Sequence, residues 1–130
     1  DNNWEGVMLR KNVEYEGKKW VGQNIEDSKI VHLKSIYHFK QITTGEMLYE
    51  EGNLLKHCVL SYIDKCLSQA SFLWSMSLEH SDKTDNLTIE IVNNQIVQIA
   101  GFKNRIPSLN EKKVITNWFE LNFSTKRVAN

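Results

Sequence analysis

The sequence predicts an α+β domain in which an antiparallel three-stranded meander packs against two central helices and a C-terminal helix, with short strands near the N-terminus. Three observations carry this prediction. Apolar and polar residues alternate over residues 72–78, an Asn-Asn pair separates two further strand-like runs, and apolar residues recur at helical spacing in two segments. The length of 130 residues is typical of one domain, which we expect to span residues 1–130.

The N-terminal part of the chain carries the weakest pattern. Aromatic and charged positions alternate around residues 16–17 and 21–22, which favours one or two short strands within residues 1–35. Alternation over residues 36–42 predicts a further strand with an aromatic face that contains Tyr37 and Phe39.

Two central helices are expected next. Thr43 lies three residues before Glu46, a capping-box spacing that predicts a helix start. We expect Gly52 to end this helix, because glycine readily adopts the left-handed conformation, and Asn53 to cap a second helix over residues 54–67. The second helix is apolar on two sides, which is typical of a central helix or of a protein interface. One stripe is Leu55, Cys58, Val59, Tyr62 and Cys66, and the other is Leu60, Ile63 and Leu67.

The meander follows these helices. Residues 72–78 alternate as a half-buried strand, and residues 80–86 have the polar composition of a loop. Residues 87–92 and 95–101 flank Asn93-Asn94, which predicts a two-residue hairpin turn because asparagine tolerates positive φ. Regular pairing places Ile91 opposite Ile96, Ile89 opposite Gln98 and Leu87 opposite Ala100 on one face, and Glu90 opposite Val97 and Thr88 opposite Ile99 on the other.

A C-terminal helix is predicted after Pro107. Ser108 and Glu111 have capping-box spacing, and a core stripe follows them. The stripe consists of Val114, Ile115, Trp118 and Leu121.

Charge and hydropathy exclude several classes of protein. Sixteen basic and sixteen acidic residues cancel, so the chain lacks the positive field of a dedicated nucleic-acid-binding protein. Six basic and two acidic residues lie within residues 101–127, a stretch more typical of a solvated face. Direct DNA binding there, through Lys103, Arg105, Lys112 and Lys113, is a weaker hypothesis. Apolar runs are too short for a membrane span.

The two cysteines indicate a reducing compartment. Cys58 and Cys66 lie eight residues apart in one predicted helix, which separates their Cα atoms by about 12 Å. A disulfide requires less than about 7 Å. Unpaired thiols, together with the lack of an apolar secretion segment, lead us to expect a cytoplasmic protein.

Several side chains are candidates for chemistry. Histidines and cysteines occur without the CxxC, HxxxH or HExxH spacing of zinc sites, so we expect no metal and no cofactor. Cys58 is a candidate nucleophile, but the adjacent His57 projects about 100° away on a helix, and a buried core cysteine is the more typical case. Glu51 and Glu90 are either an acid and base pair or structural hydrogen-bond anchors.

Separated motifs between Glu51 and Trp118 resemble the PcfJ-like family over about residues 39–118. They are Glu51-Gly52, Leu55, His57-Cys58-Val59, Tyr62, Leu87-Thr88-Ile89-Glu90, Gln98, Gly101, Asn104, Pro107 and Trp118. Residues 1–35 lie outside this resemblance, and Ala100 stands where the family often has a basic residue. The family consists of bacterial proteins associated with conjugative plasmids, phages and related mobile elements. The resemblance implies that one set of residues clusters in the fold, namely Glu51, His57, Cys58, Tyr62, Glu90, Gln98 and Asn104.

Two functions follow as hypotheses. The first is a non-catalytic accessory protein that binds a protein partner, and itself as a homodimer, within a nucleic-acid machine such as a conjugation complex or a CRISPR effector of antiviral defence. Contact with nucleic acid would then be indirect, and no membrane is involved. The alternative is a small hydrolase or nuclease that uses Glu51, His57, Cys58 or Glu90 in a pocket between the helices and the meander.

Overall fold

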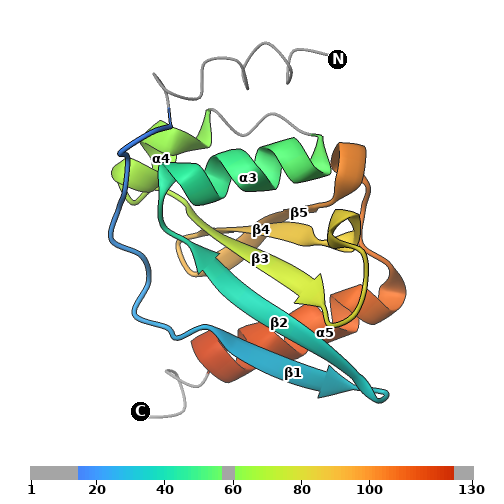
Figure 1. The fold of residues 1–130 in the computed structure, drawn as a ribbon. Coiled ribbons are helices and arrows are strands. Elements are labelled where there is room, and N and C mark those ends of the chain that lie inside the picture. Colours follow the sequence, from blue (N-terminus) through green and yellow to red (C-terminus); the bar gives the residue numbers. More distant parts are fainter. Residues whose placement is uncertain (1–14, 57–60, 125–130) are drawn as a thin grey trace.

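The computed structural model describes residues 15–56 and 61–124, in which an antiparallel sheet carries helices on both faces (Figure 1). The sheet has five strands that lie in chain order, so the predicted meander is extended by an N-terminal hairpin. The strands are β1 (Ser28–His32), β2 (Ser35–Ile42), β3 (Phe72–Leu78), β4 (Leu87–Val92) and β5 (Gln95–Ala100). The helices are α3 (Gly45–Leu55), α4 (Tyr62–Leu67) and α5 (Leu109–Phe119). The predicted α+β class is confirmed.

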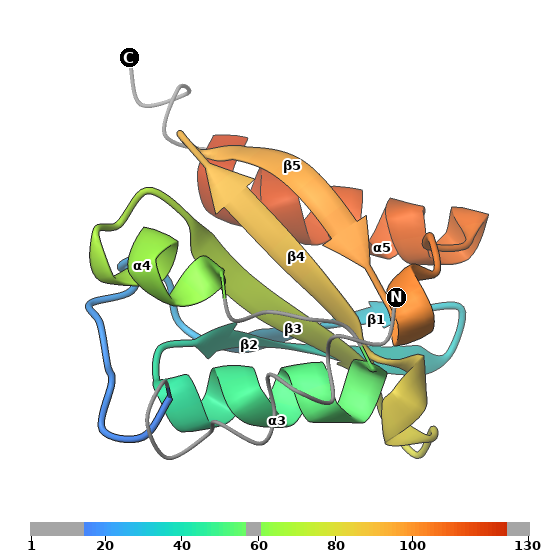
Figure 2. The ribbon, with the colours of Figure 1, turned by 90° about the horizontal axis from the view of Figure 1, so that it is seen from above.

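The helices divide between the two faces of the sheet. Seen from above, α3 and α4 lie on one side of β3 and β4, and α5 lies on the other (Figure 2). Within the described part of the chain, no helix has the length and apolar character that a membrane span requires.

A large aromatic core fills the space between the sheet and α5. Trp118 stacks on Phe39 with 4.6 Å between ring centroids and meets the edge of Trp74 at 5.0 Å. The capping box predicted at the start of α5 is confirmed. The Ser108 hydroxyl accepts from the Glu111 backbone N–H, and the Glu111 carboxylate accepts from the Ser108 backbone N–H. The rest of this core comes from alternate positions of the strands, among them Met76, Leu87, Ile89 and Ile91, and from Val114 and Ile115 of α5.

Leu121 does not belong to that core, contrary to the predicted stripe. It is 57% exposed, and Phe123 is buried instead. The helix continues from α5 into a π-helical turn over Glu120–Ser124. A π turn places residues five apart on the same side of the helix, so Phe123, five residues after Trp118, continues the core stripe in place of Leu121.

A second core lies between the sheet and the α3–α4 layer. Leu48 of α3, Ile63 and Cys66 of α4 and Leu73 of β3 are buried together with Trp20 from the N-terminal segment. The Trp20 indole donates to the Ile42 carbonyl at 3.0 Å. Around residues 16–22 the structure has one isolated bridge, Lys19 to Thr44, and the N-terminal strand forms later, at Ser28–His32.

The α3 helix differs from its prediction at both ends. Its N-terminal cap is Thr44, whose hydroxyl accepts from the Met47 amide, so the cap predicted at Thr43 is one residue too early. The helix then runs through Gly52 and Asn53 to Leu55. The expected stop at Gly52 and cap at Asn53 are therefore wrong. Leu55 is fully buried, and burying a leucine stabilises by about 1.5–3 kcal/mol, which outweighs the roughly 1 kcal/mol that glycine costs within a helix.

The second helix is shorter than the predicted span of residues 54–67. It begins at Tyr62, and residues 57–60 lie outside the described part of the chain. Ile63 and Cys66 are buried, whereas Leu67 is 42% exposed. In its described residues this helix is thus apolar on one side, toward the sheet.

The hairpin turn is confirmed, but the predicted register is not. Asn93 and Asn94 have φ values of 53° and 59°. Beyond the predicted pair of Ile91 and Ile96, a β-bulge leaves Val97 as an extra residue. Each bulge residue moves the following side chains to the opposite face. As a result Gln98 pairs with Glu90, Ile99 with Ile89 and Ala100 with Thr88.

Candidate functional site

A row of polar side chains lies on the sheet face beneath α3 and α4. The pairs Ser75–Thr88 and Leu73–Glu90 occupy this face, while Trp74 and Ile89 point toward α5. Such a row is unusual because a covered sheet face is normally apolar. We call this group the polar strip. The sheet contributes Ser75, Thr88, Glu90 and Gln98 to the polar strip, and Ser71 directly precedes β3. The helices contribute Glu51 from α3 and Tyr62 from α4.

Glu51 forms one half of the polar strip. Thr88 donates its hydroxyl hydrogen to Glu51 Oε2 at 2.5 Å, and Ser75 donates to Oε1 at 3.0 Å. The side chain is buried, and burial raises the pKa of Glu51 to about 6 although both hydroxyl contacts lower it. A carboxyl group with such a pKa is partly protonated near neutral pH.

Glu90 forms the other half. Ser71 donates to Glu90 Oε2 at 2.8 Å, and the Tyr62 hydroxyl lies 3.2 Å from Oε1 and 2.9 Å from Gln98 Oε1. A phenol has one hydrogen to donate, so it can serve only one of these two oxygens at a time. If the Gln98 amide is turned by 180°, its nitrogen donates to the Tyr62 oxygen. The Tyr62 hydroxyl then donates to Glu90, and all three side chains have a partner.

The charge of Glu90 affects two neighbouring groups. Burial, followed by the nearby Glu90 carboxylate, raises the pKa of Tyr62 to about 12. The same two causes raise the pKa of the Cys66 thiol to about 12. Because the thiolate is the reactive form of cysteine, Cys66 is a buried core residue and not a nucleophile at neutral pH.

The two halves of the strip are adjacent. Thr88 and Glu90 are two residues apart on β4, which corresponds to about 7 Å along the strand. The bulge at Val97 completes the arrangement, since it brings Gln98 opposite Glu90 on the strip side of the sheet. Without it, Gln98 would face the aromatic core.

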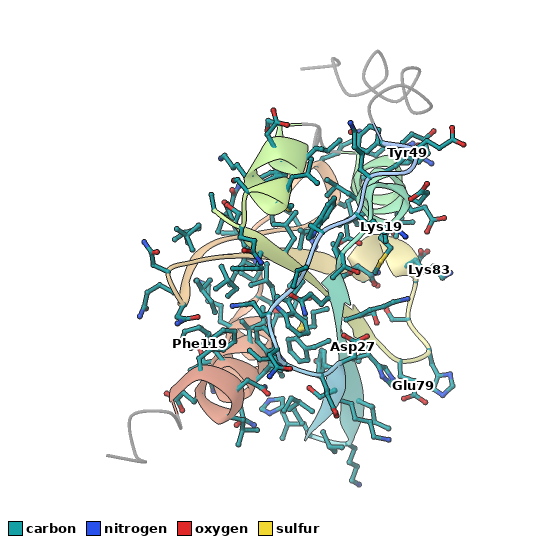
Figure 3. All side chains as sticks on the ribbon, turned by 90° about the vertical axis from the view of Figure 1, so that its left-hand side faces the viewer. Lys19, Asp27, Tyr49, Glu79, Lys83 and Phe119 are labelled. Atoms are coloured by element: carbon teal, nitrogen blue, oxygen red, sulfur yellow. The ribbon has the colours of Figure 1, made fainter. Side chains whose placement is uncertain are left out.

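One end of the strip opens into a pocket of about 460 Å³ between α3 and the sheet. Glu51 and Ser75 line its inner wall. Glu79 and Lys83, labelled in Figure 3, lie on the same side of the molecule, where the chain leaves β3. The remaining lining residues are Lys40, Ile42, Met47, Glu50, Leu54, Ser77, Leu78, His80, Ser81 and Asn86.

Two histidines contact Glu79, one of the residues that line this pocket. His38 Nε2 lies 2.9 Å from Glu79 Oε1, and His80 Nε2 lies 3.4 Å from Oε2. The hydrogen bond with His38 is the main cause that lowers the pKa of the Glu79 carboxyl group below its ordinary value. Glu79 is therefore ionised at neutral pH and adds negative charge to the pocket mouth.

Comparison with protein-family models places the chain among known sequences. The model of the PcfJ-like protein family matches residues 6–116. The chain belongs to the PcfJ-like family. The match begins at residue 6, so it includes β1, β2 and the N-terminal segment as well as the motifs from residue 39 onward. No curated protein and no solved structure matches the chain.

The structure of this PcfJ-like protein brings together four of the seven motif residues expected to cluster. Glu51, Tyr62, Glu90 and Gln98 all belong to the polar strip. Asn104 is exposed in a turn beyond β5 and forms no side-chain hydrogen bond with the other described residues. His57 and Cys58 lie outside the described residues.

The hydroxyl groups of the polar strip in this PcfJ-like protein were not predicted from the sequence. Ser71, Ser75 and Thr88 donate to the two glutamates. For Ser75, the alternation of polar residues over residues 72–78 was the available signal, but the same alternation describes a strand with a solvent-facing side.

The four basic residues proposed for DNA binding have different surroundings, since Arg105 forms hydrogen bonds within the protein and the three lysines are exposed. Arg105 bonds both oxygens of Glu111 at 2.9 Å and donates to the Asp85 carbonyl at 2.8 Å. It therefore joins the loop before β4 to the start of α5. Lys103, Lys112 and Lys113 are exposed.

In residues 15–56 and 61–124, no three acidic, histidine or cysteine side chains lie close enough to bind one metal ion.

Proposed function

We propose that this PcfJ-like protein is a non-catalytic accessory protein that binds a protein partner within a nucleic-acid machine in the cytoplasm. The machine is one of mobile elements or of antiviral defence, such as a conjugation complex or a CRISPR effector. The mobile-element association of the family supports the setting. The observation that supports partner binding is the exposed edge of the sheet at β5.

The two edges of the sheet differ in character. Among the described residues β5 pairs only with β4, and its sequence QIVQIA contains no charged residue and no proline. Soluble proteins commonly protect edge strands with lysine or proline. The opposite edge, β1, carries Lys29 and is followed by Lys34. The β5 edge is therefore the one suited to accept a further strand.

An extended segment of the partner fits this edge. Main-chain hydrogen bonds would supply affinity, and Val97, which is 54% exposed, would supply an apolar contact. The bulge at Val97 keeps the pairing short, which suits a reversible contact better than aggregation. Pairing of β5 with β5 of a second copy would produce the proposed homodimer, and the net charge of zero opposes neither arrangement.

A lysine placed on the edge tests this proposal. The proteins to test as partners are the purified products of the genes next to the gene of this protein. Val97→Lys should weaken their binding at least tenfold, because pairing would bring the ammonium group against the partner strand. Val31→Lys is the matched control, since Val31 is 65% exposed on the other edge. Binding is measured by biolayer interferometry, and light scattering separates a homodimer from a complex with a partner. Equal affinities for both variants would contradict the proposal.

A small hydrolase or nuclease is the second candidate. The observation that favours it is Glu51, whose pKa of about 6 suits a general acid or base and whose side chain lines a pocket. If this candidate is correct, the purified protein cleaves a nucleic-acid or ester substrate, and Glu51→Gln abolishes turnover while its circular dichroism spectrum is retained. An activity that survives Glu51→Gln would exclude Glu51 from the chemistry.

A further inference from the structure

The pocket beside α3 contains a buried carboxylate that its neighbours do not neutralise. Ser75 and Thr88 each donate one hydrogen bond to Glu51. Each carboxylate oxygen has two acceptor positions, so both oxygens keep capacity for a further donor. Ser75 and Glu51 both line the pocket, which makes the pocket the route by which a donor from outside reaches the carboxylate.

Charge in the pocket favours a cation as that donor. Buried carboxylates are normally paired with a positive group. Among the residues that the structure describes, no lysine, arginine or histidine side chain forms an ion pair with Glu51. The charged and titratable groups of the lining are Lys40 from β2, Glu50 and Glu51 from α3, and Glu79, His80 and Lys83 from the segment after β3. Three carboxyl groups thus face two ammonium groups.

The apolar part of the lining defines the shape of the ligand. Ile42, Met47, Leu54 and Leu78 also contribute to the pocket. An arginine or lysine side chain has an aliphatic stem that packs on such residues and a charged end that a carboxylate binds. The volume of about 460 Å³ lies within the range of about 300–1,000 Å³ found for ligand pockets.

We propose that this pocket binds a guanidinium or primary ammonium group on an aliphatic stem, which forms an ion pair with Glu51. The group can come from an arginine or lysine side chain of a protein or from a free amine. The lining contains no residue of β5, so this inference is independent of the edge contact proposed above. Val97→Lys should leave this pocket unaffected, and pocket variants should leave the edge unaffected.

Binding of a cation should depend on pH with a defined sign. The ligand pairs with the ionised form of Glu51, whose pKa is about 6, so affinity should be about tenfold lower at pH 5 than at pH 7. His80 also lines the pocket, and the pH dependence is therefore measured in a His80→Asn variant as well, where the effect of Glu51 should persist.

The experiment is a titration followed by two-dimensional NMR of the Ser75 and Thr88 amides. The probes are N-acetyl-arginine amide, its neutral isostere N-acetyl-citrulline amide, a Gly-Arg-Gly peptide blocked at both ends, and ethylguanidinium. We expect both arginine probes to bind and the citrulline probe to bind at least tenfold more weakly. Ethylguanidinium binding as tightly as the peptide would identify a free small-molecule cation as the ligand, and tighter peptide binding would identify a protein side chain.

Two variants decide the outcome. Glu51→Gln should weaken the arginine probes at least tenfold, whereas Glu50→Gln, an exposed neighbour in the same lining, should change affinity less than threefold. Met47→Trp fills the pocket from α3 with Glu51 left in place, and it should also abolish binding. Equal binding of arginine and citrulline probes, or wild-type affinity in either Glu51→Gln or Met47→Trp, would overturn the proposal.

Discussion

At the scale of single residues, two buried glutamates, Glu51 of α3 and Glu90 of β4, have different surroundings between the helices and the sheet. The Glu90 carboxylate contacts the hydroxyl groups of Ser71 and Tyr62, and Gln98 is its cross-strand neighbour. Glu51 has two hydroxyl donors and an open pocket beside it. Since burial disfavours the ionised form, Glu51 costs stability when it is charged.

Replacing Glu51 by glutamine should remove a pH dependence of stability. The folded protein holds the Glu51 proton up to about pH 6, above the ordinary value of 4.5, so Glu51 stabilises the fold fully below pH 4.5 and progressively less as pH rises to 6. This difference between the pKa of Glu51 in the folded and in the unfolded protein corresponds to about 2 kcal/mol of stability. The free energy of unfolding of the wild type, relative to Glu51→Gln, should therefore fall by about 2 kcal/mol between pH 4 and pH 7.5.

Urea denaturation at several pH values measures this difference. Glu50→Gln is the matched control, because Glu50 is exposed on the same helix and should give a difference that is constant with pH. Acidic groups whose pKa is lowered in the folded state, such as Glu111, contribute equally to both proteins and cancel in the comparison. If the free energies of unfolding of the wild type and of Glu51→Gln changed in parallel with pH, the raised pKa of Glu51 would be contradicted.

The sequence indicated the two carboxylates and the Gln98 amide of the polar strip but not the hydroxyl groups that bond to the carboxylates. Glu90 and Gln98 stand out because each interrupts an apolar pattern, and Glu51 was expected at the end of α3. The hydroxyl donors Ser75 and Thr88 were not identifiable, since serine and threonine at alternate strand positions are equally common on solvent-facing sides. Their role requires a helix on that face, which only the tertiary structure provides.

At the scale of elements, local chemistry predicted some boundaries and tertiary packing set others. The β3 strand and the start of α5 follow from patterns within a few residues. The end of α3 does not, because burial of Leu55 outweighs the preference of Gly52 for a helix terminus. The register of β5 depends on the bulge at Val97, and a bulge leaves no mark in the composition of an apolar strand.

The start of α5 offers a direct test of a local contribution. Ser108→Ala removes the side-chain acceptor for the Glu111 amide and should lower the free energy of unfolding by about 1 kcal/mol. Asn110→Ala in the same turn is the control, since Asn110 is exposed and makes no capping contact within the described residues. Urea denaturation at pH 7 compares the two. Equal midpoints for both variants would show that the Ser108 cap contributes nothing.

At the scale of the whole molecule, one sheet separates two hydrophobic cores. Successive residues of β3 serve opposite sides, with Leu73 in the core beneath α3 and α4 and Trp74 in the core against α5. Removing either helical layer would expose apolar side chains of the same strands. The two cores are therefore expected to depend on each other for stability.

This dependence predicts a single unfolding transition for core variants on either side. Leu48→Ala should cost about 2–5 kcal/mol and Trp118→Ala about 3–5 kcal/mol, because both side chains are fully buried. In each variant, circular dichroism and tryptophan fluorescence should give coincident urea curves, which is the test of two-state unfolding. Leu109→Ala, at a residue that is 73% exposed, should change stability by less than about 0.5 kcal/mol. If Leu48→Ala unfolded in two steps, with helical signal lost before fluorescence from the α5 core, the layer of α3 and α4 would be an independently folding unit, and the polar strip would open without unfolding of the sheet.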